Sequence, residues 1–161
     1  MATYDRILAF AVATGQTATV FVVGGKLMDW QMWREARECP TRTRSELRVM
    51  VATLNPTLIV SEDPDGLNCR KRGKSLKLLR TLVQAAADEP VTHIKLERPR
   101  RYENRYDEAK ALCQRFPEIA AWCPDKVKSY ESEPRSLTYF EALAYVAEVL
   151  EAKGQDADHG I

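Results

Sequence analysis

Hydrophobic residues near the start of the chain are arranged as in β-strands. Residues 7–14 and 17–23 are dense in apolar and β-prone side chains, and the short link Gly15-Gln16 separates them. Gly24-Gly25 ends the second run, and residues 26–33 then alternate apolar with polar side chains. Strands that follow one another across links this short pair in antiparallel fashion. We therefore predict a three-stranded antiparallel meander at the start of the fold.

Helical spacing alternates with strand patterns in the remainder of the chain. Apolar residues recur every three or four positions within residues 47–54, 76–86, 106–113 and 140–150, which predicts four helices. Residues 57–61 and 91–96 are short apolar or β-prone runs, which are typical of strands in the middle of a sheet. The first two helices are predicted to end before Pro56 and Pro90, and Asn104 is suited to cap the third.

This order of elements predicts an α/β fold. Crossovers that contain a helix join parallel strands, so the later strands should extend the meander in parallel. The expected architecture is a mixed sheet with three antiparallel strands, then parallel strands, and helices on both faces, an order of elements that resembles the RNase H-like fold. A chain of 161 residues is long enough to bury its own core. We expect a single domain over residues 1–153 and a flexible polar tail over residues 154–161.

Composition limits the classes of partner and site. The net charge is +1, so a surface for nucleic acid would have to be a local basic patch. The sequence contains neither an apolar run of membrane-spanning length nor the pattern of a signal peptide, and we expect a cytoplasmic protein with reduced thiols. The four cysteines form no C-x-x-C pair, which argues against a structural zinc site.

Three segments, in this order and at this spacing, resemble a known family. They are ILAFAVATG at residues 7–15, LIVSED at residues 58–63 and YFEALAYVAEVL at residues 139–150. Together they resemble the opening strand, the fourth strand and the last helix of the RuvC-type branch of RNase H-like proteins, the Holliday-junction resolvases. The resemblance implies a divalent-metal-dependent endonuclease that acts on structured DNA, and by analogy a homodimer.

The resemblance also implies which acidic residues would be catalytic. The glutamate that ends the fourth strand in the family corresponds to Glu62, and the acid of the last helix corresponds to Glu141. With Asp63 as a further candidate ligand, these residues would hold Mg²⁺ or Mn²⁺. The first-strand aspartate of the family corresponds to Ala11, and another acidic position corresponds to Thr138. Loss of the first-strand carboxylate, which normally lies between two metal ions, should cost on the order of a thousand-fold in rate.

The acidic residues by themselves leave other interpretations open. A glutamate at the end of a strand, such as Glu62, is also typical of a solvated surface acid. Glu141 lies in the first turns of a predicted helix, where the helix dipole favours a negative charge. Asp63 either joins the acidic cluster or caps the turn that begins with Pro64.

Two basic stretches follow predicted strands. The first lies at residues 70–74, and the second begins at Arg98 and continues to Lys110. Because ligands of open α/β sheets bind at the carboxyl ends of the strands, these stretches are candidates for phosphate contacts. The candidate nucleic-acid-binding residues are Arg70, Lys71, Arg72, Lys74, Arg98, Arg100, Arg101, Arg105 and Lys110. A solvated loop is the alternative interpretation of either stretch.

Aromatic residues supply further candidates. Trp30 and Trp33 are three positions apart, so they should face opposite sides of a strand. Tyr102 and Tyr106 either stack on bases or pack a helix against its loop. Trp122 and Tyr130 belong to a segment that does not match the resolvases, and they would either close over the site or form a partner surface.

Two functions are therefore compatible with the sequence. The first is a divalent-metal-dependent endonuclease of RuvC type that acts on structured DNA, with an acidic cluster that Ala11 leaves incomplete. The alternative is a non-catalytic RNase H-like module that binds nucleic acid or a protein partner. Dependence on a divalent metal separates the two, because only the nuclease would need Mg²⁺ or Mn²⁺ and would lose its activity in Glu62→Gln.

Overall fold

The computed structural model describes residues 5–13, 15–33, 40–126 and 134–159. Its centre is one five-stranded mixed sheet with the strand order β3-β2-β1-β4-β5. The strands are β1 (Arg6–Ala13), β2 (Gln16–Val23), β3 (Lys26–Trp33), β4 (Leu58–Glu62) and β5 (Thr92–Leu96). The first three pair in antiparallel fashion, and β4 and β5 then run parallel to β1. The predicted α/β architecture is confirmed.

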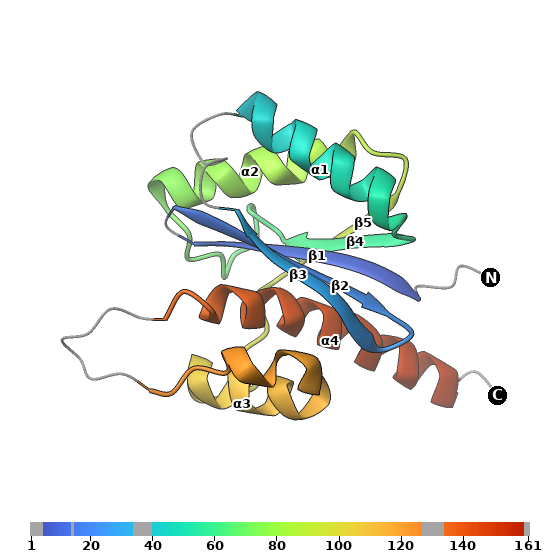
Figure 1. Cartoon of the computed structure of the whole chain (residues 1–161), viewed down its shortest axis with the longest axis vertical. Coiled ribbons are helices and arrows are strands. Elements are labelled where there is room, and N and C mark those ends of the chain that lie inside the picture. Colours follow the sequence, from blue (N-terminus) through green and yellow to red (C-terminus); the bar gives the residue numbers. More distant parts are fainter. Residues whose placement is uncertain (1–4, 14, 34–39, 127–133, 160–161) are drawn as a thin grey trace.

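Helices cover both faces of this sheet, as Figure 1 shows. The helices are α1 (Pro40–Leu54), α2 (Gly73–Ala87), α3 (Arg105–Arg115) and α4 (Leu137–His159), and a 3₁₀ helix, η2 (Pro117–Trp122), follows α3. Helices α1 and α2 lie on one face, and α3 and α4 lie on the other (Figure 1). Helix α4 continues past Gly154 to His159, where the sequence predicts a flexible tail.

The central strand β1 contributes to two hydrophobic cores because both of its faces are covered. Ala9 and Ala11 pack in the core beneath α4, whereas Leu8 and Phe10 pack in the core beneath α1 and α2. Alternate side chains of a strand point to opposite faces, which explains this division. The side chain of Ala11 therefore points toward the helix that carries Glu141.

The register of the parallel strands brings the candidate residues to one edge of the sheet. Ala9 on β1 pairs with Val60 on β4, and Glu62 at the end of β4 pairs with Leu96 at the end of β5. Two positions beyond the Ala9–Val60 pair lie Ala11 on one strand and Glu62 on the other. The loops that follow β4 and β5 carry the two basic stretches, so both start at this edge.

The edge strand β3, on the other side of the sheet from β5, carries Trp30 and Trp33. Trp30 packs on the α4 side and Trp33 on the α1 and α2 side, as their spacing predicts. The ring of Trp122 meets that of Trp30 edge to face, with ring centroids 5.5 Å apart, so Trp122 packs on β3 and is not among the residues that line the hollows at the strand ends. Tyr130 lies outside the described residues.

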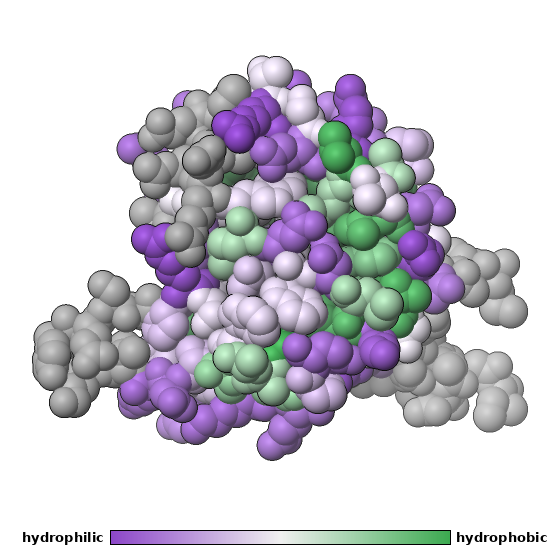
Figure 2. Space-filling model, viewed as in Figure 1, coloured by the Kyte–Doolittle hydropathy of each residue, from purple (hydrophilic) through white to green (hydrophobic). Residues whose placement is uncertain are grey.

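The surface is mixed in character, as expected for the composition. In the view of Figure 2, hydrophilic residues cover the outer sides of both helical layers, and hydrophobic residues gather along the band between the layers. Among the described residues, no helix is long and apolar enough to cross a membrane.

Candidate nucleic-acid interface around an acid pair

The two predicted catalytic acids lie close together, but neither is solvated. Glu62 is the last residue of β4, and its side chain is 3% exposed. Leu58, Val60 and Glu62 alternate along the strand, which directs Glu62 toward the α4 face. Glu141 lies in the first turns of α4, and its side chain is 12% exposed. The alternative interpretation of a solvated surface acid therefore does not hold for Glu62. Glu141 remains placed where the helix dipole favours a negative charge, and its side chain is largely buried as well.

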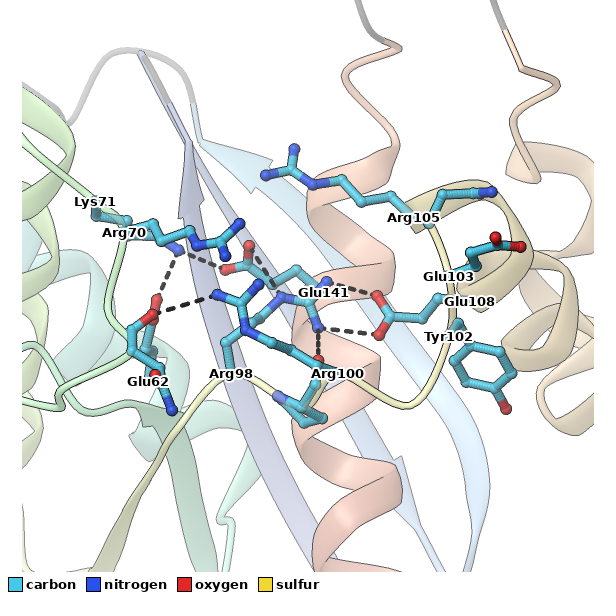
Figure 3. A pocket seen from close by; sticks show the side chains of 13 residues that line it. Glu62, Arg70, Lys71, Arg98, Arg100, Tyr102, Glu103, Arg105, Glu108 and Glu141 are labelled. Carbon is cyan, nitrogen blue, oxygen red and sulfur yellow. Dashed lines mark hydrogen bonds and ion pairs between the residues drawn. The ribbon is translucent and has the colours of Figure 1, made fainter.

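The Lys71 side chain bridges the two acids. Its Nζ atom donates to Glu62 Oε1 at 2.7 Å and to Glu141 Oε2 at 2.9 Å (Figure 3). Burial lowers the pKa of Lys71, but the charges and hydrogen bonds of Glu141 and Glu62 outweigh burial and leave the pKa above its usual value. Lys71 is therefore a permanent cation at neutral pH.

A second cation, Arg98, ties the acid pair to α3. Its guanidinium donates to both carboxylate oxygens of Glu108, at 2.5 Å and 3.0 Å, and its Nε lies 3.6 Å from Glu141 Oε1. Burial lowers the pKa of Arg98, but the hydrogen bonds with Glu108 and the charge of Glu141 outweigh burial and raise it. Such two-point pairing fixes geometry as well as charge. Arg98 thus positions Glu141 and α3, and little of it is exposed to a ligand.

A buried tyrosine completes the surroundings of Glu141. The hydroxyl of Tyr145, one turn along α4, donates to Glu141 Oε2 at 3.5 Å. Burial raises the pKa of Tyr145, and the charges of Glu141 and Glu62 raise it further. Tyr145 therefore remains a protonated donor. Glu141 consequently accepts hydrogen bonds from Lys71 and Tyr145 and forms an ion pair with Arg98.

Two hollows of about 430 Å³ and about 640 Å³ open at this end of the sheet. They share five lining residues, namely Arg70, Lys71, Arg98, Arg105 and Glu141. We call the two joined hollows the crevice. Figure 3 shows the side chains of the first hollow, which come from the loops after β4 and β5 and from α3 and α4. The crevice therefore draws its charges from segments far apart in the sequence.

Six of the nine predicted nucleic-acid-binding residues line the crevice: Arg70, Lys71, Arg72, Arg98, Arg100 and Arg105. Lys74 and Lys110 are exposed but line neither hollow. Arg101 also lies elsewhere, because its guanidinium pairs with Glu148 and Glu151 on α4. Tyr102 lines the first hollow with 46% of its surface exposed, whereas Tyr106 packs against the α4 core.

The crevice also contains residues that the sequence does not single out. Arg135, immediately before α4, lines the second hollow, and Glu108 and Tyr145 complete the ion network. Only the position of Arg135 just before a predicted helix could have drawn attention to it. The pairing of Glu108 with Arg98 depends on how α3 packs against the rest of the fold, which no local sequence pattern predicts.

The remaining candidate acid positions do not add a carboxylate to the pair. Ala11 is 1% exposed in the core beneath α4. Thr138 is buried, and its hydroxyl accepts from Gln16 Nε2 at 2.7 Å. Asp63 lines neither hollow, because its Oδ1 accepts the backbone N–H of Asp65 at 3.0 Å in a turn. For Asp63 the geometry therefore supports the turn cap, and its role as a metal ligand stays a prediction.

These side chains do not fit the divalent-ion centre that the resemblance implies. Mg²⁺ and Mn²⁺ favour octahedral sites built from several oxygen ligands. In the described parts of the chain, no group of three or more His, Cys, Asp or Glu residues is placed to hold a metal. The two carboxylates that are present already bind the Lys71 ammonium. Glu62 and Glu141 therefore form an ion-paired site, in which the expected cation position is filled by a side chain.

His93 belongs to a different environment. Its Nε2 lies 2.8 Å from the hydroxyl of Ser61, a fully buried residue, and its ring packs near that of Phe10 in the core beneath α1 and α2. Burial, with a smaller effect of Lys95, lowers the pKa of His93 to about 4. The histidine is therefore neutral at physiological pH and lies away from the crevice.

Comparison with known proteins identifies the fold. No known family model matches the sequence, and no curated protein is detectably similar to it. Among solved structures, Thermus thermophilus RuvC in complex with a Holliday junction is similar over 91% of this chain and 96% of that chain, with a TM-score of 0.60 and 8% identity. The fowlpox virus resolvase in complex with Holliday junction DNA is similar over 90% of this chain and 99% of that chain, with a TM-score of 0.57 and 12% identity.

The yeast mitochondrial Holliday junction resolvase is also similar, over 99% of this chain and 86% of that chain, with a TM-score of 0.55 and 11% identity. Identities this low are informative about the fold and leave the activity open. In each case the likeness extends over nine-tenths or more of this chain. The protein has the RuvC-type, RNase H-like fold that its sequence predicts.

Proposed function

We propose that this protein binds structured DNA, with the phosphate backbone seated in the crevice. The observation that carries this proposal is the convergence of arginines from three separate segments on one concave surface. These arginines are Arg70, Arg72, Arg98, Arg100, Arg105 and Arg135. Except for Arg98, all of them are exposed. Exposed guanidinium groups around a concave surface are suited to phosphate oxygens, which they contact in bidentate fashion.

The structural neighbours support DNA, and branched DNA in particular, as the ligand. The Thermus thermophilus and fowlpox virus proteins are each described as complexes with a Holliday junction. The crevice of this chain lies at the carboxyl ends of its parallel strands, the position where open α/β sheets bind ligands. Tyr102, exposed at the first hollow, offers an aromatic face to an unpaired base.

The test is a binding titration by fluorescence anisotropy with four labelled ligands: a four-way junction, a flap, a linear duplex and an RNA–DNA hybrid. We expect the junction to bind most tightly, with an affinity that falls steeply as salt rises. The Arg70→Ala/Arg135→Ala variant should bind more weakly at every salt concentration. It should also lower the salt slope by about two, one for each phosphate-binding side chain that it removes.

The matched control is Lys74→Ala/Lys110→Ala, which removes the same charge outside the crevice. We expect it to retain most of the wild-type affinity and slope. Equal losses in the two double variants would show that the crevice is not the binding surface. Absence of binding to all four ligands at low salt would refute the proposal. Sedimentation of the junction complex would show whether two copies bind, as the resemblance to resolvases implies.

A metal-dependent endonuclease is the second candidate, and one observation favours it. Glu62 and Glu141 do come together at the strand ends, as the resemblance implies, each within hydrogen-bonding distance of the same atom. Cleavage of the four labelled ligands with Mn²⁺, by the chain and by Ala11→Asp, separates the candidates. Cutting by the wild-type chain that Glu62→Gln abolishes would establish the nuclease. Cutting only by Ala11→Asp would reveal a centre that lacks one ligand. Binding without cutting by either protein would support the binding function.

A further inference from the structure

Lys71 occupies an unusual position for a lysine. It belongs to the irregular segment between β4 and α2, yet its side chain is only 14% exposed. Lysine is rarely buried unless its charge is compensated. Here the compensation is twofold, because Glu62 and Glu141 each accept one hydrogen bond from the ammonium. These two acids come from a strand and a helix that are far apart in the sequence.

The contacts have the form of a cation site in which the cation is covalently attached. One positive centre lies 2.7 Å and 2.9 Å from oxygens of two carboxylates that converge on it from different elements. The carboxylate side chains are 3% and 12% exposed, so the charges meet in a poorly hydrated environment. In such an environment Coulomb attraction is much stronger than in water.

From this geometry we propose that the Lys71 ammonium is a built-in cation of the crevice. It holds Glu62 and Glu141 together in place of a divalent ion, and it offers a phosphate oxygen the positive charge that such an ion would otherwise supply. The second part rests on the proposed DNA-binding function. The first part stands on the acid pair alone.

The composition of the site favours a lysine over a divalent ion. The Lys71 ammonium and the Arg98 guanidinium are the cations that pair with the carboxylates of Glu62, Glu141 and Glu108. Ala11 adds no further oxygen to the set. Each of the three carboxylates therefore already has an organic cation as a partner, and a divalent ion that displaced Lys71 would find only two carboxylates.

Lys71 also has a donor left for a ligand. An ammonium carries three N–H groups, and the two acids use two of them. Lys71 lines both hollows, so its head is part of the surface that a phosphate would meet. Arg70, the neighbouring residue, is exposed at the same hollows. A phosphate oxygen in the crevice would thus accept one hydrogen bond from the buried ammonium of Lys71 and another from the exposed guanidinium of Arg70.

The test is a Mn²⁺ titration, followed by the electron paramagnetic resonance signal of the free ion. We expect the wild-type protein to show no stoichiometric Mn²⁺ site tighter than about 1 mM, because its acids are already paired. Lys71→Met keeps the apolar stem and removes the charge, and it should gain one Mn²⁺ site that is at least about ten-fold tighter. Adding Glu62→Gln to Lys71→Met should abolish the gained site.

The control is Lys74→Met, an exposed lysine of the same region, which should bind no more Mn²⁺ than the wild type. A tight Mn²⁺ site in the wild-type protein would overturn the inference, and this arm needs no variant to fold. A folded Lys71→Met that gains no site would overturn it as well, since the acid pair would then not be a cation site.

The phosphate part is tested with the four-way junction. Wild-type affinity should be equal, within about two-fold, in EDTA and in about 100 µM Mn²⁺ at constant ionic strength. Affinity that requires Mn²⁺ would overturn the role of Lys71 as the cation. Failure to bind the junction under both conditions would refute the proposed function and the phosphate part, and the Mn²⁺ titration would still decide the acid-pair part.

Discussion

Replacing Lys71 by methionine should destabilise the protein far more than replacing any exposed lysine. The variant retains a flexible apolar stem of similar length but removes the ammonium. Glu62 and Glu141, with side chains 3% and 12% exposed, would then face each other without the cation between them. Two like charges in a poorly hydrated site repel each other, and each loses its strongest hydrogen bond.

The magnitude follows from the burial of the three groups. Removing one partner of a buried ion pair typically costs about 3–5 kcal/mol, because the remaining charge stays desolvated. The pKa of Lys71 lies above its usual value even though burial lowers it, so the attraction of the two acids exceeds the desolvation cost of the ammonium. Arg98 still contacts Glu141 in the variant, which places the expected loss near the lower end, about 3 kcal/mol.

Urea denaturation at neutral pH measures this loss, and a second substitution tests its cause. Adding Glu62→Gln to Lys71→Met removes the charge of Glu62, which has lost its ion-pair partner, and should recover part of the lost stability. Glu62→Gln alone should destabilise, since it breaks an existing pair. A raised pKa means that the ammonium stabilises the fold at all pH values below about 10.5 and ceases to do so only as the pH rises through the folded-state value. The loss should therefore be the same at pH 7 and pH 8.

Lys74→Met provides the reference, because Lys74 is exposed and should change stability by no more than about 0.5 kcal/mol. The reasoning would be refuted if Lys71→Met lost less than about 1 kcal/mol, the range of surface ion pairs. It would also be refuted if Glu62→Gln lowered the free energy of unfolding as much in the Lys71→Met variant as in the wild type, because the two residues would then be energetically independent.

The core histidine, a helix cap and the crevice rim each give a further prediction. His93, whose pKa is lowered to about 4, must gain a proton when the chain unfolds at acidic pH, so the free energy of unfolding should fall by up to roughly 3 kcal/mol between pH 6.5 and pH 4. His93→Gln should flatten this pH dependence in urea titrations, and an unchanged pH dependence would contradict the prediction. Asn104 accepts the N–H groups of Tyr106 and Asp107 at the start of α3, so Asn104→Ala should lower the unfolding free energy by about 1 kcal/mol in urea denaturation, whereas no change would mean that water replaces the cap. Arg70→Ala alone should reduce the salt slope of junction binding by about one, and an unaltered slope would place Arg70 outside the interface.

The fold could be predicted because most of its elements carry a clear periodicity and the order of the elements is characteristic. The alternation within residues 26–33 is typical of a partly exposed strand and the apolar run before Glu62 of a strand buried on both faces, and β3 and β4 are buried in these ways. The prediction that Asn104 caps a helix is confirmed at the level of its hydrogen bonds. The sequence underestimates the length of α4, because Gly154 and the polar residues after it favour a helix end, yet the backbone remains helical to His159.

The site was predictable in its positions but not in its pairings. Glu62 ends a strand, and Glu141 begins a helix, and both positions can be read from local patterns. The bridge between them is made by Lys71, which comes from a segment without regular structure, so its direction depends on how that loop closes. Arg101 illustrates the same limit, because it lies within a basic stretch but turns to α4 and pairs with Glu148.

The arrangement of charges divides the crevice into a floor and a rim with different roles. The floor consists of Lys71, Arg98, Glu62, Glu108 and Glu141, whose two positive and three negative charges are paired with one another. Because two positive charges meet three negative ones, the floor carries one net negative charge, and it contributes chiefly to holding α3, α4 and β4 together. It adds little net attraction for a polyanion.

The rim supplies that attraction, since its arginines are exposed and come from loops around the floor. Substitutions in the floor should therefore change stability first, with Lys71 the floor residue that also contacts the phosphate, whereas substitutions in the rim should change the salt dependence of binding at constant stability. A RuvC-type fold with a divalent-ion centre would not separate in this way, because its acids would bind the ion that contacts the phosphate. Measuring stability and salt slope on the same set of floor and rim variants thus distinguishes a phosphate-binding crevice organised by Lys71 from one organised by a metal.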